Sequence, residues 1–462
     1  MPYSRLAGPF VAGALSVLGA LAPAQAETLT DALIKAYQMS PVLEAERAAL
    51  RNTDERVALA RSARRPSLTA LGSAEVAADE NSDWELFDTY QAQLQSSLLL
   101  YDHGQTAAAI DAAKSAVAAG RAQLRNVEQV VLLNTVAAFM DVRRNIQSVQ
   151  VARNNVSVLQ EQVRATRDRF DLGEVTRTDV SLAEARLAQA RANLAAFEGQ
   201  LTTAREAYLA VVGAPARDLQ APPALPQVPQ ALERIEAIAM REHPALNAAR
   251  YLETVAQYDL TRARAARGPS VSLEATATAR NADGLTGRSD NLGVGVGVTG
   301  RVPLYAGGEL SALVRQAEAV LQQRRFEVQD TARSIREEAA VALSNLRVAR
   351  ATIVANREEV RAAQVAFEGV QEEAILGART TLDVLDLEQD LRDAQLALAT
   401  SLRDEYVAAY QLLSAMGLLS VEFLNLGIPT YNPDVNYNRV QNAPYSTVEG
   451  GILEKLRDRY AR

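Results

Sequence analysis

The chain of 462 residues contains nearly the same sequence twice, at a spacing of 203 to 204 residues. The matching segments keep the same order in both copies. They are Ser40-Pro41-Val42-Leu43 and His243-Pro244-Ala245-Leu246, the runs from Arg64 to Leu68 and from Arg267 to Val271, the blocks from Leu100 to Gly104 and from Leu304 to Gly308, and Leu172-Gly173 and Leu376-Gly377. A solenoid unit is far shorter, about 20–50 residues. The chain is therefore a duplicated half-molecule, which favours a symmetric assembly over a catalytic pocket.

Composition excludes several functional classes. There are no cysteines, so the chain has no thiol nucleophile, no iron–sulfur ligand and no cysteine for a lipid anchor. The two histidines, His103 and His243, are far apart in the sequence, which argues against a zinc site or a histidine-based catalytic dyad. The formal net charge of −8 gives no electrostatic reason to expect nucleic acid as a partner. We therefore expect no enzyme, no cofactor and no metal.

The N-terminus, residues 1–26, has the pattern of a secretory signal peptide. Arg5 supplies the positive charge, and an apolar stretch follows from Leu6 to Ala22. Ala24-Gln25-Ala26 is an A-x-A cleavage site, which predicts a mature chain that starts at Glu27. The alternative is an uncleaved membrane anchor. No later segment has the roughly 18 consecutive apolar residues of a membrane-spanning helix.

Helical periodicity dominates each copy. Apolar residues recur every seven positions, and the second copy keeps the same phase, 204 residues later. The first series is Val142, Val149, Val156, Val163 and Phe170, and the second is Leu346, Ile353, Val360, Phe367 and Ala374. This spacing predicts antiparallel coiled-coil hairpins over 105–213 and 309–417. Gly173 and Gly377 are the expected helix stops at the turns.

Two strand-like segments precede each long helix, at about 67–78 and 90–101 and again at 270–280 and 291–304. From Ser270 to Arg280 apolar and polar residues alternate strictly, and four apolar residues from Leu292 to Val298 alternate with glycines. Such segments fit outer-membrane strands, although a half-buried soluble sheet has the same pattern. Four strands are too few to close a membrane barrel, and an open edge cannot lie in lipid. Several chains would therefore have to share one barrel.

The predicted domains follow the repeat. Residues 27–214 form the first repeat and residues 231–427 the second. A proline-rich joint at 215–230 separates them, because helix cannot continue through its prolines. A polar C-terminal tail covers 428–462, and two alternatives stay open for it: an ordered segment or a free tail, with a possible short helix from Ile452 to Arg462.

The chain resembles the TolC-type outer membrane efflux channels. The resemblance covers the mature chain up to about Gly427. It depends on the signal peptide, the twofold repeat, the strand–strand–long-helix order and the motif Leu-Gly-x-x-Thr-x-x-Asp-Val at 172–180, which returns at 376–384. It implies a fold that is mainly α with membrane β strands. Three chains would share a 12-stranded β-barrel in the outer membrane and an α-helical tunnel in the periplasm, closed at its tip.

The resemblance also implies which residues close the tip. Asp179 in the first copy, and Arg379, Asp383 and Asp386 in the second, take the positions of the family's gate. Three copies of each acid around a narrow axis would favour cations, and an arginine that reaches a neighbouring aspartate would hold helices together. A local alternative stays open for Asp179 and Asp383, since Thr-x-x-Asp is also the pattern of a helix capping box.

Two further positions concern the same gate. Gln162 is an additional candidate, because the family can place a gate partner there. Ala374 stands where the family often has a tyrosine, so any hydrogen bond from that tyrosine is missing here. The two copies also differ at the turn, with Val175 against Arg379 and Leu182 against Asp386.

The leading functional hypothesis is a passive duct for type I protein secretion. It would connect through a periplasmic adaptor protein to an inner-membrane transporter of the ABC or RND class, with outer membrane lipid around its barrel. A multidrug or small-molecule efflux channel is the alternative within the family. An alternative of another class is a periplasmic coiled-coil adaptor or scaffold. The missing lipid-anchor cysteine and the absence of a phosphate-binding G-x-x-x-x-G-K-[ST] motif favour the leading hypothesis.

Overall fold

The structure is a computed structural model that describes residues 27–78, 86–282 and 289–442. The predicted leader with its cleavage residue Ala26, and the possible helix from Ile452 to Arg462, lie outside the described residues. Glu27, the predicted first residue of the mature chain, is buried and its backbone pairs with the joint at Leu219. No helix among the described residues is long and apolar enough to cross a membrane.

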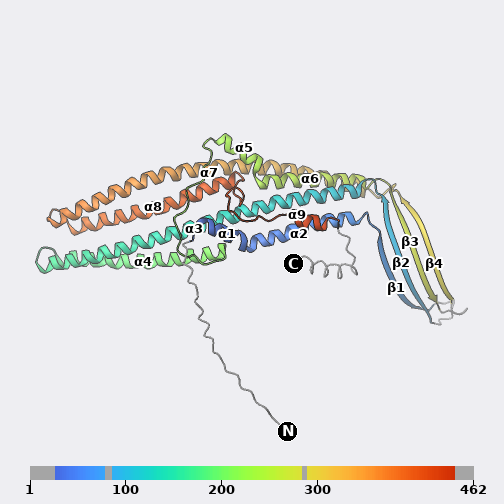
Figure 1. Ribbon diagram of the computed structural model, residues 1–462, viewed down its shortest axis with the longest axis horizontal. Helices are drawn as coiled ribbons and strands as arrows, with labels where there is room; N and C mark the ends of the chain where they lie inside the picture. Colours follow the sequence, from blue (N-terminus) through green and yellow to red (C-terminus); the bar gives the residue numbers. More distant parts are fainter. Residues whose placement is uncertain (1–26, 79–85, 283–288, 443–462) are drawn as a thin grey trace, which may run out of the picture.

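The two repeats have the same order of elements, two short helices, two strands and two long helices (Figure 1). In the first repeat these are α1 Leu29–Met39, α2 Pro41–Ser62, β1 Ser67–Ala77, β2 Phe87–Tyr101, α3 Gln105–Asp171 and α4 Arg177–Val212. In the second they are α5 Leu232–Glu242, α6 Pro244–Ala265, β3 Ser270–Ala282, β4 Ser289–Arg301, α7 Glu309–Ile375 and α8 Thr381–Ala415. The predicted class, mainly helical with four strands in a duplicated chain, is confirmed.

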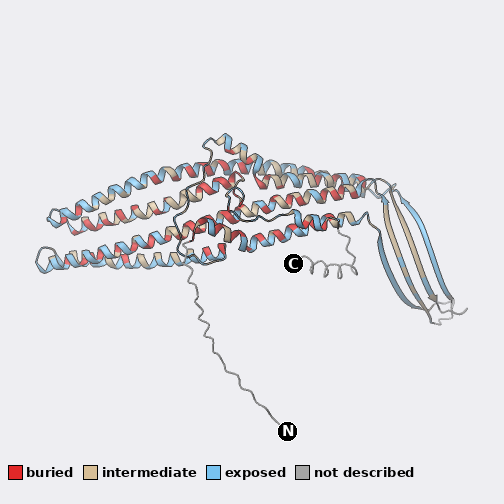
Figure 2. Cartoon of the chain, in the orientation of Figure 1, coloured by how far each residue is buried: buried red, intermediate tan, exposed pale blue. Residues whose placement is uncertain are grey.

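The long helices α3 and α7 have 67 residues each, which corresponds to about 100 Å at 1.5 Å per residue. Each begins after a glycine in the left-handed conformation, Gly104 or Gly308. Buried positions recur along both helices as a narrow stripe (Figure 2). Val142, with 0% of its surface exposed, and Leu346, with 1%, belong to this stripe. The seven-residue apolar pattern is therefore the packing seam of each hairpin.

The short helix pairs α1–α2 and α5–α6 were not predicted, although the segments that start α2 and α6 stood out as repeats. Ser40 and His243 cap these two helices, and a proline takes the first helical position in both. α1 and α5 lie near the middle of the long helices, and α2 and α6 run from there toward the sheet (Figure 1). The main apolar core lies near the middle of the long helices and includes Leu132, Phe139 and Tyr208.

The four strands form one antiparallel sheet in the order β1-β2-β3-β4. The observed strands differ from the predicted ones mainly at their ends. β2 starts at Phe87, because Phe87 and Asp88 pair with Ala77 and Val76 of β1. β4 ends at Arg301, shortly before Pro303, whose ring nitrogen has no hydrogen to donate to a ladder. β1 and β4 are the two open edges.

Part of the polar stretch after Gly427 is ordered, which is one of the two alternatives left open for it. Helix α9, Asp434–Val440, packs against α2. Asn436 donates a hydrogen bond of 2.9 Å to the buried carboxyl of Asp54, and Asp434 pairs with Arg121 at 2.7 Å. Two arginines of the main body also lie over tyrosine rings of this segment: Arg47 over Tyr431 and Arg121 over Tyr437. The polar side chains of this segment make the contacts that hold the segment against the helical body.

The joint at 215–230 contains no helix and no named strand, in keeping with its prolines. The backbone N–H of Glu27 donates to the carbonyl of Asp218, and the N–H of Gln220 donates to the carbonyl of Glu27. Tyr406 of α8 donates its hydroxyl hydrogen to the carbonyl of Pro223. The joint thus lies against the helical body and connects the two repeats across it (Figure 1).

Candidate functional site

The strand register places apolar side chains from all four strands on one face of the sheet. Residues directly opposite each other in an antiparallel pair point to the same face. Leu94 of β2, for example, pairs with Ala70 of β1 and with Ala277 of β3, which in turn pairs with Val294 of β4. This apolar face carries Leu68, Ala70, Gly72, Ala74 and Val76, Tyr90, Ala92, Leu94 and Leu98, Val271, Leu273, Ala275, Ala277 and Ala279, and Leu292, Val294, Val296 and Val298. Ser96 is a polar residue within it, and Asp88, Asn281 and Asp290 lie on the same face at the loop end of the sheet.

The other face is mainly polar, although Leu71 and Leu99 also lie on it. It carries Thr69 and Glu75, Gln91, Gln93 and Gln95, Ser272, Glu274, Thr276 and Thr278, and the glycines Gly293, Gly295 and Gly297. On the apolar face, the side chains of β4 are largely exposed, with Leu292 at 78% and Val294 at 77%. A sheet that exposes one mainly apolar face and one mainly polar face has the arrangement of a membrane barrel wall, with lipid outside and water inside.

The height of the apolar face fits a membrane. Tyr90 and Tyr101 lie on this face near the two ends of β2, eleven residues apart. At about 3.3 Å per residue and a tilt near 40°, this span gives a depth of about 28 Å, close to the roughly 25 Å of an outer-membrane barrel. Tyrosines at both ends are typical of the aromatic girdles at the two membrane surfaces.

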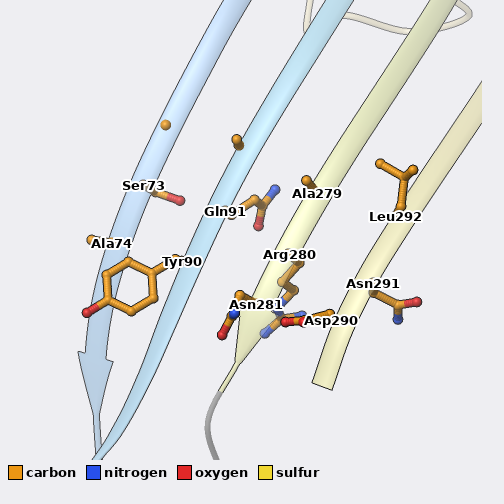
Figure 3. A pocket seen from close by; sticks show the side chains of 12 residues that line it. Ser73, Ala74, Tyr90, Gln91, Ala279, Arg280, Asn281, Asp290, Asn291 and Leu292 are labelled. Carbon is orange, nitrogen blue, oxygen red and sulfur yellow. The ribbon is translucent and has the colours of Figure 1, made fainter. Parts of the chain in front are cut away.

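A hollow of about 710 Å³ lies on the sheet near its loop end (Figure 3). Side chains of both faces line it, including Ala74 and Tyr90 from the apolar face and Ser73 and Gln91 from the polar face. A ligand pocket would present one converging set of groups. This hollow is instead a part of the curved sheet surface, and residues of all four strands at the same height line it.

At the opposite end of the molecule, the two helical hairpins turn in the same way. Gly173 and Gly377 have φ angles of +80° and +76°, in the left-handed region that glycine adopts without strain. Each following helix starts with a capping box, in which the threonine backbone N–H donates to the aspartate carboxylate. The distance is 2.8 Å for Thr176 and Asp179 and 3.0 Å for Thr380 and Asp383. The capping alternative is confirmed for both aspartates.

The caps also explain the acidity of the two aspartates. The hydroxyl and backbone N–H of Thr176 donate to Asp179 and hold the pKa of its carboxyl below the ordinary value. The backbone N–H and hydroxyl of Thr380 do the same for the pKa of Asp383. Both carboxyls are therefore charged at neutral pH, as an acidic ring would require, while part of each is engaged in its own helix start.

The other two gate candidates have partners within the chain. Arg379 pairs with Glu373, six residues earlier in the same turn, at 2.8 Å. Asp386 of α8 accepts a hydrogen bond of 2.9 Å from Arg186 of α4 and so connects the two hairpins. Asp386 is therefore a predicted gate residue with an ion pair to the other repeat.

Gln162 and Ala374, the two further positions predicted to concern the gate, lie elsewhere on the helices. Gln162 is half-buried on α3. Ala374 is buried, with 7% of its surface exposed, in a small apolar cluster with Val370 and Val384 at the tip of the second hairpin. Its counterpart in the first repeat, Phe170, is 41% exposed. Ala374 thus contributes to the apolar packing at the tip of the second hairpin.

Next to Asp386 lies a polar contact between the hairpins that was not predicted. Glu388 of α8 is 8% exposed and accepts a hydrogen bond from Asn155 of α3. Burial raises the pKa of Glu388, against the effect of the Asn155 amide. Arg186 also donates to Gln389 at 2.7 Å, and these side chains line a cavity of about 230 Å³. The heptad pattern gave no sign of this contact, since Glu388 lies beside the apolar seam rather than in it.

Comparisons with known proteins agree with this geometry. A family model described as outer membrane efflux protein matches residues 32–214 and 237–418, once for each repeat. The outer membrane efflux protein BepC of Brucella suis is 38% identical over 435 residues, which cover 94% of this chain and 95% of BepC. The alkaline protease secretion protein AprF of Pseudomonas aeruginosa is 26% identical over 313 residues, which cover 66% of this chain and 65% of AprF.

A solved structure shares the fold. The outer membrane protein VceC of Vibrio cholerae matches with a TM-score of 0.72 at 23% identity, over 84% of this chain and 96% of VceC. The family matches cover most of the chain and both repeats. The chain therefore belongs to the outer membrane efflux protein family of TolC-type channels, and it is an outer membrane protein whose helices extend into the periplasm.

Proposed function

We propose that three copies of this chain form a passive export duct, with a shared barrel of twelve strands above a helical tunnel. The observation that carries this proposal is the sheet, which has one mainly apolar face and two open edges, β1 and β4. An open edge in lipid leaves backbone groups without partners. Pairing of β4 with β1 of the next copy satisfies both edges, and the number three follows from the family.

The helices point to the same assembly. α3 packs against helices of its own repeat and against α6 and α8 of the other repeat, whereas α7 packs against α5, α6 and α8 of its own repeat. By the symmetry of the repeat, α2 and α4 of a second copy would supply the partners that α7 lacks. Valines on α7 are accordingly exposed in the single chain, with Val341 at 48% and Val348 at 62%.

For cargo, we propose type I secretion of proteins, driven by an inner-membrane ABC transporter through a periplasmic adaptor protein. The relative named as a protease secretion protein supports this choice. The glycines on the polar face of β4 also leave that part of the barrel interior without side chains, which suits a bulky cargo. The family of the chain is one of channels, so the adaptor alternative finds no support.

Small-molecule efflux with an RND transporter is the second candidate. The 38% identical relative is named as an efflux protein, which supports it. Within either system, we propose Asp179, Arg379, Asp383 and Asp386 as the residues around the periplasmic constriction, with Gln162 as a further candidate. Charged carboxylates at the tip, with their lowered pKa values, support a cation-selective entrance.

Deletion of the gene tests the function and the cargo together. Protein secretion predicts that specific polypeptides disappear from the culture medium and accumulate in the cell, while tolerance to toxic small molecules stays unchanged. Efflux predicts that tolerance to toxic small molecules falls, while the polypeptides in the culture medium stay unchanged. If neither export nor tolerance changes and no adaptor co-purifies with the cross-linked protein, the duct proposal is wrong.

A further inference from the structure

We infer that the turns between the helices and the sheet bind anionic phospholipids of the periplasmic leaflet through the lipid phosphate. Two arginines carry this surface, Arg64 and Arg267, and the proposed function does not use them. They hold equivalent positions in the two repeats, 203 residues apart. Each lies in the turn between a short helix and the first strand of its repeat, α2–β1 for Arg64 and α6–β3 for Arg267.

Positive charge gathers at this end of the sheet. The segments that connect the four strands to the helices, 61–68, 100–106, 264–271 and 300–309, contain six arginines and two acids. The segments that connect the strands to each other at the opposite end, 75–90 and 280–292, contain eight acids and two arginines. The whole chain has a net charge of −8. The positive end of the sheet is therefore a local feature that the overall composition does not explain.

Arg64 and Arg267 are exposed and have no acid bonded to them. An arginine on the neighbouring helix does have one: Arg264 pairs with Glu318 at 2.9 Å. Among the described residues, no ion pair or side-chain hydrogen bond engages Arg267, and Arg64 has only a longer-range electrostatic interaction with Asp102. Both guanidinium groups are thus available to an anion from outside the chain.

The two turns lie at the depth of the phospholipid headgroups. Because the helices extend into the periplasm, the helix end of the sheet is its periplasmic end (Figure 1). Tyr101, 50% exposed, lies at this end of the apolar face and pairs with Val271. Arg267 precedes Val271 by four residues, at most about 14 Å along the chain. The headgroup layer is about 5–8 Å thick, and an arginine extends its charged end toward such a layer.

Neighbouring groups hold the Arg267 turn in place. His103 follows the end of β2 with a φ of +53°, a conformation that is uncommon outside glycine. Its ring lies so close to Gly268 that a Cβ added there would come within 2.3 Å of the ring. The Tyr101 hydroxyl lies 3.2 Å from Nδ1 of the same ring. We call Tyr101, His103 and Arg267 the headgroup site.

The chemistry of the headgroup site suits a phosphate. A guanidinium is always charged and binds phosphate oxygens through charge-assisted hydrogen bonds. The tyrosine hydroxyl and the histidine ring offer further polar groups beside it. A basic residue near the membrane surface strengthens the attraction of anionic lipid by about fivefold. Lipids with a net negative charge should therefore be preferred to zwitterionic lipids.

In the proposed ring, equivalent sites occur six times. The repeat places Tyr305 and Gly307 at the positions of Tyr101 and His103, 204 residues later. Tyr305 is 89% exposed in the single chain. Pairing of β4 with β1 of the next copy would bring Tyr305 beside Arg64 of that copy. The sites between copies thus rest on the proposed function, whereas the site at Arg267 is complete within one chain.

Lipid binding to the purified full chain tests the inference. Delipidated protein in mild detergent is titrated with phosphatidylglycerol or with phosphatidylcholine of the same acyl chains, and native mass spectrometry counts the bound lipids. We expect Arg64→Gln with Arg267→Gln to weaken the binding of phosphatidylglycerol about fivefold at each site. The binding of phosphatidylcholine should change less than about twofold, because its choline offsets the phosphate charge.

Arg301→Gln is the matched control. Arg301 lies at the same end of the sheet but pairs with Ser270 on the polar face, which faces away from lipid in a barrel. This variant should bind phosphatidylglycerol as the parent protein does. Unchanged binding in the double variant would overturn the inference, and so would an equal loss in Arg301→Gln. Displacement of the lipid by inorganic phosphate at the same concentration would also overturn it, because the site would then bind free phosphate.

A charge-preserving variant separates charge from structure. Arg64→Lys with Arg267→Lys keeps a cation at both positions, so we expect binding of phosphatidylglycerol within about twofold of the parent protein. A lysine variant that binds as weakly as the glutamine variant would overturn the inference. The same spectra give the number of chains. Trimers without a preference for anionic lipid would refute the inference alone, whereas single chains that keep this preference would refute only the ring.

Discussion

At the scale of single residues, Asp383 and Asp386 lie one turn apart at the start of α8 but have different surroundings. Asp383 binds its own helix start through Thr380, whereas Asp386 binds Arg186 of the other hairpin. One charge is thus held locally, and the other is partly neutralised by a guanidinium. The two acids should not contribute equally to the field at the tip of the tunnel.

Replacing each acid with its amide separates these contributions. We expect Asp383→Asn to lower cation selectivity in planar bilayers more than Asp386→Asn, because Arg186 already offsets part of the charge of Asp386. Asparagine keeps a hydrogen-bond acceptor for the cap, so Asp383→Asn should leave the thermal stability unchanged. Equal reversal potentials for both variants and the parent protein would refute an acidic ring.

Glu388 provides a prediction about pH. Its folded-state pKa lies above the unfolded value, so folding favours the protonated acid. The associated stability is fully present below the unfolded pKa and is lost as the pH rises through the folded pKa. We expect Glu388→Gln to reduce the loss of stability between about pH 5 and pH 8. Thermal unfolding of the purified protein in detergent at both pH values measures this.

Glu184→Gln is the matched control, because Glu184 holds the equivalent position on α4 and is exposed in the single chain. A pH dependence that is the same in the parent protein and in Glu388→Gln would show that burial of Glu388 has no energetic consequence.

At the scale of elements, α9 is held to α2 by buried polar contacts. The carboxyl of Asp54 is 1% exposed, burial raises its pKa, and the amide of Asn436 is its hydrogen-bond donor. We expect Asn436→Leu to lower the free energy of unfolding by about 1–3 kcal/mol, because a buried acceptor loses its donor. Differential scanning calorimetry of the detergent-solubilised protein measures the change.

Asn438 lies on the exposed side of the same helix and serves as the control. Asn438→Leu should change stability by no more than about 0.5 kcal/mol, as for other surface substitutions. If both substitutions have the same small effect, α9 does not stabilise the body of the protein.

The elements that depend on a local repeating pattern could be predicted from sequence. The strands follow from alternation, the long helices from seven-residue spacing, and the turns from Gly173 and Gly377. The short helices α1 and α5 have only 11 residues each, too few to show a sustained period. α9 has seven residues, and tertiary contacts with Asp54 and Arg121 stabilise it.

The candidate site was predictable to the same extent. The capping boxes are local and could be read from Thr-x-x-Asp. The partners of Asp386 and Glu388 could not, because Arg186 and Asn155 lie 200 and 233 residues away along the chain. Pairs of this kind depend on how two hairpins lie against each other. A heptad pattern specifies only which face of each helix packs against the other helix of its own hairpin.

At the scale of the whole molecule, the duplication explains why one chain is incomplete. Each repeat supplies two strands and one hairpin. Among the residues that the structure describes, the second repeat has no partner for the outer side of α7 or for the free edge of β4. Copies placed head to tail around an axis provide partners for α7 and for the edge of β4. Such a ring closes only when the rotation between neighbouring copies divides a full turn.

Native mass spectrometry tests the ring of copies most directly. It measures the mass of the protein extracted from outer membranes in mild detergent. We predict a single species of three chains, which persists when the concentration is lowered and dissociates only on denaturation. A single chain recovered from the soluble periplasmic fraction, with no oligomer in the membrane, would contradict the shared barrel on which the proposed duct depends.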